Sequence, residues 1–131
     1  MVNNQKKLKV FLIEDAPQVR AVLTDVLSQS GKVDIVGYAD GERDAVRQLR
    51  SMDWDVAVVD IALKQGTGLD VLAKLQRDDR QYGKRVVFAG ESNKILRDRT
   101  IALGADKFYD KARDIDALVD DILDSTPGTD G

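Results

Sequence analysis

Charged residues follow apolar runs at three points of this sequence. Glu14 and Asp15 come after KVFLI, Asp60 comes after VAVV, and Lys111 comes after KFYD. A carboxylate that emerges from a buried strand needs partners, because burial disfavours its charge. If the three carboxylates lay together they would repel one another, and a divalent cation together with the Lys111 ammonium would relieve that repulsion. Since all the ligands would be oxygens, Mg²⁺ is the expected ion.

The composition restricts the remaining chemistry. The chain has 131 residues, of which 43% are hydrophobic, and this predicts about one domain. It has no cysteine and no histidine, so thiolate and imidazole ligands and the usual general base are excluded. With 23 acidic and 20 basic residues the formal charge is -3, which argues against direct binding of nucleic acid. No run approaches the ~18 apolar residues of a membrane span, so we expect a cytoplasmic protein without membrane contact.

The period of the apolar residues alternates along the chain between that of a strand and that of a helix. Apolar runs predict five strands, at residues 9–15, 33–39, 55–61, 85–90 and 106–110. Helical spacing of apolar residues predicts five helices, centred on residues 19–27, 45–52, 69–75, 95–103 and 115–123. In the first of these helices Val19, Val22, Leu23, Val26 and Leu27 are expected to form one apolar stripe. Gly31 and Gly104 are placed to end the first and fourth helices.

This alternation predicts the fold class. Strict strand–helix alternation favours a parallel sheet with helices on both faces, here a (βα)₅ flavodoxin-like, doubly wound open sheet with strand order 2-1-3-4-5. We expect one domain over residues 1–125 and a flexible C-terminal tail over residues 126–131. Ligands of such sheets bind at the carboxyl ends of the strands, and Glu14, Asp15, Asp60 and Lys111 are all expected there.

Each of these features also has a simpler interpretation when it is taken alone. An acidic pair after a strand is often a turn or a helix N-cap, here with Pro17 opening the helix. Lys111 alone would be a solvated surface lysine, and the GTG segment would be a turn rather than a phosphate-binding loop. The joint placement of the acids and the lysine at one edge favours a functional site.

Four motifs together resemble the receiver domain of two-component response regulators. They are IED at the first strand, VVDIAL at the third, GTGLDVL after it, and GADKFYDK around the fifth. The resemblance covers residues 8–123, which leaves little room for an output domain and implies a stand-alone receiver.

The resemblance implies that Asp60 accepts a phosphoryl group from a histidine kinase or a histidine phosphotransfer protein. The chain would then signal to an unknown downstream protein and would not act as an enzyme on a separate substrate. The resulting acyl phosphate would be hydrolysed at a rate that two positions of the family influence, and these positions are Ala62 and Glu91 here.

The resemblance also implies a metal site. Asp15, Asp60 and the backbone carbonyl of Ala62 would hold Mg²⁺, and Glu14 would reach the ion directly or through water. Lys111 would pair with oxygens of the phosphoryl group.

The sequence departs from the family pattern at the positions that couple phosphorylation to a conformational switch. Ala89 stands where the family has Thr or Ser at the end of the fourth strand, and the next residue, Gly90, has no hydroxyl either. Ser92 lies three residues beyond Ala89. Phe108 stands at the aromatic switch position, which is often Tyr, and Ala112 replaces the Pro that commonly follows the lysine. We therefore expect weak or atypical switching.

Other functions remain open. A phosphorylation-independent interaction module could use the surface formed by residues 95–123, although such a module would have no need of Asp15, Asp60 and Lys111 together. An FMN-binding flavodoxin would need a phosphate loop after the first strand, where EDAPQVR would repel phosphate. A phosphoaspartyl phosphatase would need a second acid near its nucleophile, and Asp60-Ile61-Ala62 has none.

Overall fold

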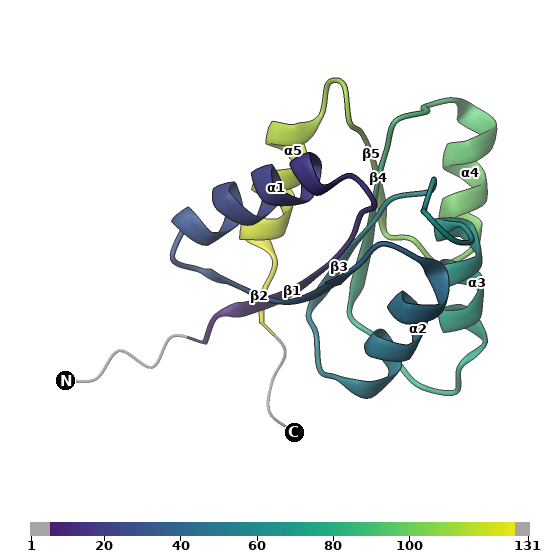
Figure 1. Cartoon of the computed structure of the whole chain (residues 1–131), viewed down its shortest axis with the longest axis horizontal. Helices are drawn as coiled ribbons and strands as arrows, with labels where there is room; N and C mark the ends of the chain where they lie inside the picture. Colours follow the sequence, from purple (N-terminus) through teal and green to yellow (C-terminus); the bar gives the residue numbers. More distant parts are fainter. Residues whose placement is uncertain (1–5, 128–131) are drawn as a thin grey trace.

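Strands and helices alternate along the chain in a computed structural model that describes residues 6–127 (Figure 1). The strands are β1 (Leu8–Ile13), β2 (Val33–Ala39), β3 (Val56–Val59), β4 (Lys84–Ala89) and β5 (Lys107–Asp110). The helices are α1 (Pro17–Gln29), α2 (Glu42–Ser51), α3 (Gly68–Arg77), α4 (Lys94–Ala102) and α5 (Ile115–Asp124). All five predicted strands and all five predicted helices are present; the bounds of β2 match the prediction, and the other bounds differ from it by at most three residues.

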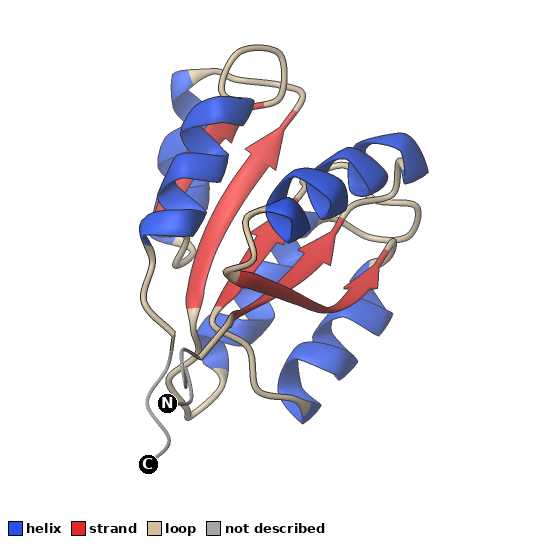
Figure 2. Ribbon diagram, turned by 90° about the vertical axis from the view of Figure 1, so that its left-hand side faces the viewer, coloured by secondary structure: helices blue, strands red, loops and turns tan. Residues whose placement is uncertain are grey.

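The strands form one parallel sheet in the order β2-β1-β3-β4-β5. This is the predicted flavodoxin-like arrangement. Figure 2 shows the strands side by side, with helices on both faces of the sheet. Because all strands run in the same direction, their carboxyl ends meet at a single edge of the sheet.

The two faces of the sheet carry separate cores. On one face α1 and α5 contribute the fully buried Leu23, Leu27, Leu118 and Ile122, which pack on side chains of β1, β3 and β4. On the other face α2 and α3 pack against alternate residues of the same strands, around Phe11 and Trp54. Since β1, β3 and β4 are covered on both faces, their nearly continuous apolar sequences are explained.

Helix α1 differs from the prediction in which of its apolar residues are buried. Leu23 and Leu27 are fully buried, whereas Val22 and Val26 are 48% and 39% exposed. The predicted five-residue stripe is therefore wrong at these two valines, because the buried side of α1 is narrower than the spacing suggested. The predicted ends of α1 and α4 are confirmed, since Gly31 and Gly104 both have positive φ, at 73° and 104°.

The amino-terminal edge of the sheet, opposite the carboxyl ends, has its own cluster of side chains. Trp54, just before β3, is buried and donates from Nε1 to the carbonyl of Leu49 over 2.9 Å. Its ring stacks on Tyr82 with a centroid distance of 5.7 Å. The Tyr82 hydroxyl donates to Asp78 over 2.5 Å, and Arg50 binds the same carboxylate through two nitrogens.

Two expectations concern the ends of the chain and membranes. Helix α5 ends at Asp124, but most of the predicted tail, residues 128–131, lies outside the described residues. Within residues 6–127, no helix combines the length and the apolar character that crossing a bilayer requires.

The fluorescence of Trp54 can test whether this residue lies at the opposite end of β3 from Asp60. Six residues of extended chain separate it from Asp60, roughly 20 Å at ~3.3 Å per residue. We expect saturating Mg²⁺ to change Trp54 fluorescence by only about a few per cent, because the electrostatic effect of an ion weakens with its distance from the indole. Strong quenching that saturates with Mg²⁺ and disappears in Asp15→Asn would contradict the placement of Trp54 away from the acidic site.

Candidate functional site

Backbone hydrogen bonds place the candidate residues at the carboxyl ends of neighbouring strands. The N–H of Glu14 donates to Ala39 and that of Asp60 to Ile13, each over 3.0 Å. The Lys111 N–H donates to the carbonyl of Ala89 over 2.9 Å. The ladder bonds of the sheet thus continue one residue past the strands and fix where the side chains begin.

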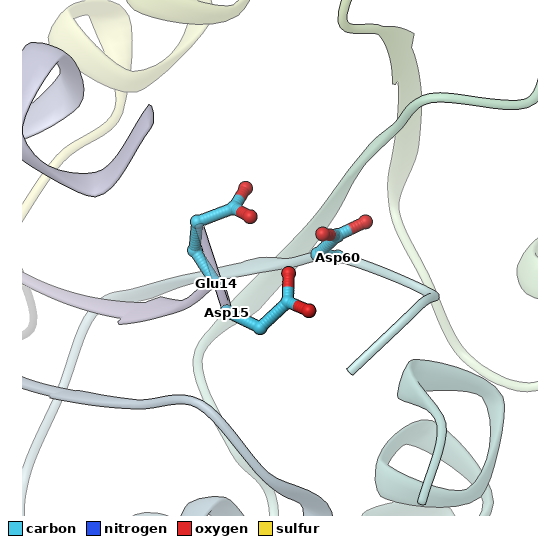
Figure 3. A group of neighbouring side chains, drawn as sticks. All are labelled: Glu14, Asp15 and Asp60. Carbon is cyan, nitrogen blue, oxygen red and sulfur yellow. The ribbon is translucent and has the colours of Figure 1, made fainter. Parts of the chain in front are cut away.

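The three predicted acids come together at this edge. Each of Glu14, Asp15 and Asp60 offers one carboxylate oxygen, and these oxygens all lie within 4.8 Å of one another. Figure 3 shows the acids grouped at the ends of β1 and β3. Glu14 and Asp60 are only 2% and 4% exposed, whereas Asp15 is exposed to solvent. The group is therefore open on one side, and an all-oxygen set of this kind suits a hard cation such as Mg²⁺.

Lys111 joins the two buried acids. Its Nζ lies 2.8 Å from Oε1 of Glu14 and 2.7 Å from Oδ2 of Asp60. Burial disfavours the Lys111 ammonium, but the hydrogen bonds to Asp60 and Glu14 outweigh burial and raise its pKa. Lys111 is therefore firmly charged and offsets part of the repulsion between the acids.

Glu14 retains an unfavourable charge despite that contact. Burial raises the pKa of Glu14 from its ordinary value of 4.5 to about 6; the Lys111 contact opposes this rise and the nearby Asp60 charge adds to it. Its other oxygen, Oε2, accepts the N–H of Ala16 over 3.1 Å.

The N-cap interpretation of the acidic pair is not what the structure shows. The N-cap residue of α1 is Ala16, which makes no side-chain cap, and Pro17 opens the helix as expected. Glu14 instead binds Lys111 and the N–H of Ala16, and the side chain of Asp15 is exposed. Arg20 supports the same turn, since its guanidinium donates to the carbonyl of Glu14 over 2.7 Å.

The segment after Asp60 turns tightly, as the GTG motif predicted. Gly66 has a φ of 74°, and Ala62 pairs with Thr67 across the turn. The N–H of Gly68 donates to the carbonyl of Ile61 over 2.8 Å. A Cβ on Gly68 would lie 2.1 Å from the carbonyl oxygen of Asp60, so only glycine lets α3 begin this close to the acid.

At the end of β4 the structure has no hydroxyl side chain. Ala89 is the last residue of β4, is 1% exposed, and pairs with Asp110 of β5. Ser92 is instead bound by Arg97, which donates to its hydroxyl over 3.2 Å. The Arg97 guanidinium also lies over the ring of Phe108, 5.5 Å from its centroid. Glu91 is exposed in the loop between β4 and α4.

Sequence reasoning missed two acids that shape the loops around the site. Asp110 is 8% exposed and accepts the N–H of Ala112, which bends the chain around Lys111. Glu42 is 7% exposed, at the start of α2, and binds the loop after Asp60. The spacing of apolar residues could not identify either acid. For Glu42, the only local signal was its position directly after a glycine at the start of a helix.

Glu14 should make the stability of the metal-free protein depend on pH. Because its folded pKa exceeds the ordinary value, the folded state binds the proton more tightly, and the free energy of unfolding falls as the pH rises from 4.5 to about 6. We expect Glu14→Gln to be more stable than the wild type above that window, by up to about 2 kcal/mol. Urea denaturation with chelator, followed by Trp54 fluorescence from pH 4 to 8, measures the difference, and a gain of equal size at every pH would contradict this assignment.

Comparison with known proteins identifies the family of this chain. Residues 10–123 match the family described as response regulator receiver domain. A protein-glutamate methylesterase/protein-glutamine glutaminase of Methanospirillum hungatei is 32% identical over 110 residues, which are 82% of this chain and 32% of that protein. The nitrate/nitrite response regulator NarL of Escherichia coli is 24% identical over 97% of this chain and 58% of its own length. The chain thus spans about a third of the first relative and somewhat over half of the second.

Solved structures share the fold. The receiver domain of a NarL from Mycobacterium tuberculosis superimposes with a TM-score of 0.78 at 24% identity, over 91% of this chain and 98% of that one. A CheX–CheY–BeF3–Mg complex from Borrelia burgdorferi gives a TM-score of 0.80 at 18% identity, over 88% of this chain and 87% of that one. From the family match over residues 10–123 and the shared (βα)₅ sheet, we conclude that this chain belongs to the response regulator receiver domains of two-component signalling.

Proposed function

We propose that this receiver domain accepts a phosphoryl group on Asp60, in a Mg²⁺-dependent reaction, from a histidine kinase or a histidine phosphotransfer protein. The phosphorylated domain then signals by contact with a downstream protein, in the cytoplasm. The chain is a phosphoacceptor that catalyses its own phosphorylation and dephosphorylation, and it has no separate substrate.

One observation carries this proposal. Lys111 lies within hydrogen-bonding distance of both Glu14 and Asp60, and Asp15 completes a carboxylate group whose oxygens lie within 4.8 Å. Two nearly buried acids and a lysine are a costly arrangement if they only stabilise the fold, because burying ions is unfavourable even when they are paired. Phosphoryl transfer requires this combination of an ionised oxygen and neighbouring positive charge.

The donor set fits Mg²⁺. Glu14, Asp15 and Asp60 offer only carboxylate oxygens, and Asp15 faces solvent, so the ion would keep several water ligands. We propose that Asp15, Asp60 and the carbonyl of Ala62 hold the ion, with Glu14 bound directly or through water. When bound, Mg²⁺ offsets the negative charge of the acids and of the incoming phosphoryl oxygens.

The roles of the side chains follow from the chemistry of transfer from a phosphohistidine. An oxygen of Asp60 forms the new bond to phosphorus while the phosphorus–nitrogen bond breaks, and its electron pair returns to the imidazole of the donor. Asp60 attacks as an ionised carboxylate, so no general base is needed. Lys111 exchanges its contact with Oδ2 of Asp60 for contacts with the phosphoryl oxygens, where it stabilises the charge of a loose transition state.

Hydrolysis of the acyl phosphate would be governed by residues beside Asp60. Ala62 and Glu91 are both exposed and belong to the two loops that flank the site. We propose that a small Ala62 leaves water free access to the phosphoryl group, and that Glu91 affects where that water sits.

Phosphorylation itself can be tested by incubating the protein with a small-molecule phosphodonor and Mg²⁺ and measuring its intact mass. We expect the addition of one phosphoryl group, on Asp60, which disappears in Asp60→Asn and when the divalent cation is chelated. Asp25→Asn is a matched control, because it removes one carboxylate from the exposed surface of α1 and leaves the site unchanged.

Full labelling of Asp60→Asn would place the acceptor elsewhere. No labelling of the wild type by any donor or kinase would favour the alternative, a phosphorylation-independent interaction module.

The residues after β4 favour a weak coupling between phosphorylation and conformational change. Ala89 has no hydroxyl for the phosphoryl group, and the hydroxyl of Ser92 already accepts a hydrogen bond from Arg97. A ligand shifts a two-state equilibrium only through its differential interaction with the two states. We propose that phosphorylation moves the loop after β4 and Phe108 only slightly.

Ala89→Thr tests this explanation. A hydrogen bond to a charged group contributes about 1.5–3 kcal/mol, which corresponds to roughly a 10- to 150-fold change in population. We expect fluoroberyllate, as a phosphoryl mimic, to shift the amide resonances of residues 90–101 and Phe108 slightly in the wild type and strongly in Ala89→Thr. Ala89→Val has the shape of threonine without its hydroxyl and should behave like the wild type. Large, saturated shifts in the wild type would show that the coupling runs by another route.

A further inference from the structure

The loop after β3 is held by the start of α2, although the two segments are about twenty residues apart in sequence. We define this loop as residues 61–67. The N–H of Lys64 donates to the carbonyl of Asp40 over 3.0 Å, and the N–H of Glu42 donates to the carbonyl of Gln65 over 2.8 Å. Gly41 and Gln65 form a parallel bridge. The backbone of the 61–67 loop is thus bonded to the turn between β2 and α2.

The side chain of Glu42 lies under this loop and uses both of its oxygens. Oε1 accepts the N–H of Thr67 over 3.2 Å, and Oε2 accepts the Nζ of Lys74 on α3 over 2.6 Å. A Cβ on Gly66 would lie 2.2 Å from Oε1 of Glu42, so the loop packs directly on the carboxylate. The hydrogen bond from Lys74 is the main cause that lowers the pKa of Glu42, which therefore stays ionised at neutral pH.

These contacts lead back to the carboxylate group in two steps. Thr67, which Glu42 binds, pairs across the turn with Ala62. The N–H of Gly68, the next residue, binds the carbonyl of Ile61, directly after Asp60. The position of the Ala62 backbone relative to Asp60 therefore depends on the position of Thr67, and through it on Glu42.

We propose that Glu42 is a positioning residue of the phosphorylation site: with Lys74, it holds the 61–67 loop so that the Ala62 carbonyl faces the same cation as Asp60. Glu42 touches neither the cation nor the phosphoryl group. The proposal rests on the function proposed above, because it concerns the affinity of the site for a divalent cation.

Two variants break the contact from opposite sides. Glu42→Gln keeps the size of the side chain and an acceptor for Thr67 but loses the charge that binds Lys74. Lys74→Met keeps Glu42 and removes its partner from a position that is 41% exposed, where the substitution is readily accommodated. Asp121→Asn is the matched control, since it breaks the partly buried Lys84–Asp121 pair between α5 and the start of β4, and it keeps an oxygen that can accept the Tyr109 hydroxyl.

The first readout needs no metal. In the metal-free protein we expect amide hydrogen exchange at Lys64 and Thr67 to be about 10-fold faster in both variants, because their hydrogen bonds open more often. Exchange at Val58, inside β3, should keep its wild-type rate, and Asp121→Asn should leave Lys64 and Thr67 unchanged.

The second readout is the Mg²⁺ dissociation constant from calorimetry. Loss of a residue that supports a metal ligand typically weakens binding by 10- to 100-fold, and we expect about 10-fold for both variants and no change for Asp121→Asn. Faster loop exchange with an unchanged dissociation constant would overturn the proposal and leave Glu42 a structural residue only. If the wild type is phosphorylated but binds Mg²⁺ no more tightly than the variants, only the proposal for Glu42 is wrong. If the wild type binds no Mg²⁺, the proposed function is wrong as well.

Discussion

The Lys111 ammonium makes the other features of the site compatible. Parallel strands bring their carboxyl ends to one edge, and this sheet places Glu14 and Asp60 there, nearly buried and within reach of one another. Like charges at such a distance disfavour ionisation of both. One lysine, held at the end of β5, contacts both acids and offsets part of their repulsion, while Asp15 remains exposed to solvent. The lysine thus balances part of the charge of the two acids within the protein itself.

Much of the fold and the acidic group could be predicted because the signals are local. Each strand is a short apolar run, and a charged residue directly after it must lie at the sheet edge, so Glu14, Asp60 and Lys111 were expected where they lie. Strand β4 ends at Ala89, one residue before the predicted end at Gly90. The burial of Glu42 was not, because its partners Thr67 and Lys74 lie 25 and 32 residues further along the chain. Nor was the exposure of Val22, since periodicity gives the direction of a face but not its width.

The two loops that flank Asp60 differ in how they are held. The 61–67 loop is bonded to α2 through backbone, carboxylate and ammonium contacts. The loop after β4 is linked to α4 through the Arg97–Ser92 contact, and Arg97 also covers Phe108. The first loop is held by more contacts than the second, so the second is the easier of the two to displace. If the domain changes shape on phosphorylation, the change is expected beside β4 and β5 rather than beside β3.

The stacked pair of Trp54 and Tyr82 has a consequence for how this fold tolerates a strained site. Functional sites that hold like charges together lower stability, and the rest of the protein must compensate. Here the indole, the tyrosine and the Arg50–Asp78 pair stabilise the edge of the sheet opposite the acids. Substitutions in that cluster would reduce the stability margin without altering the site, so they would limit which further changes the acidic edge could accumulate during evolution. The stability that the aromatic stack contributes therefore sets how many destabilising substitutions the distant acidic edge can tolerate.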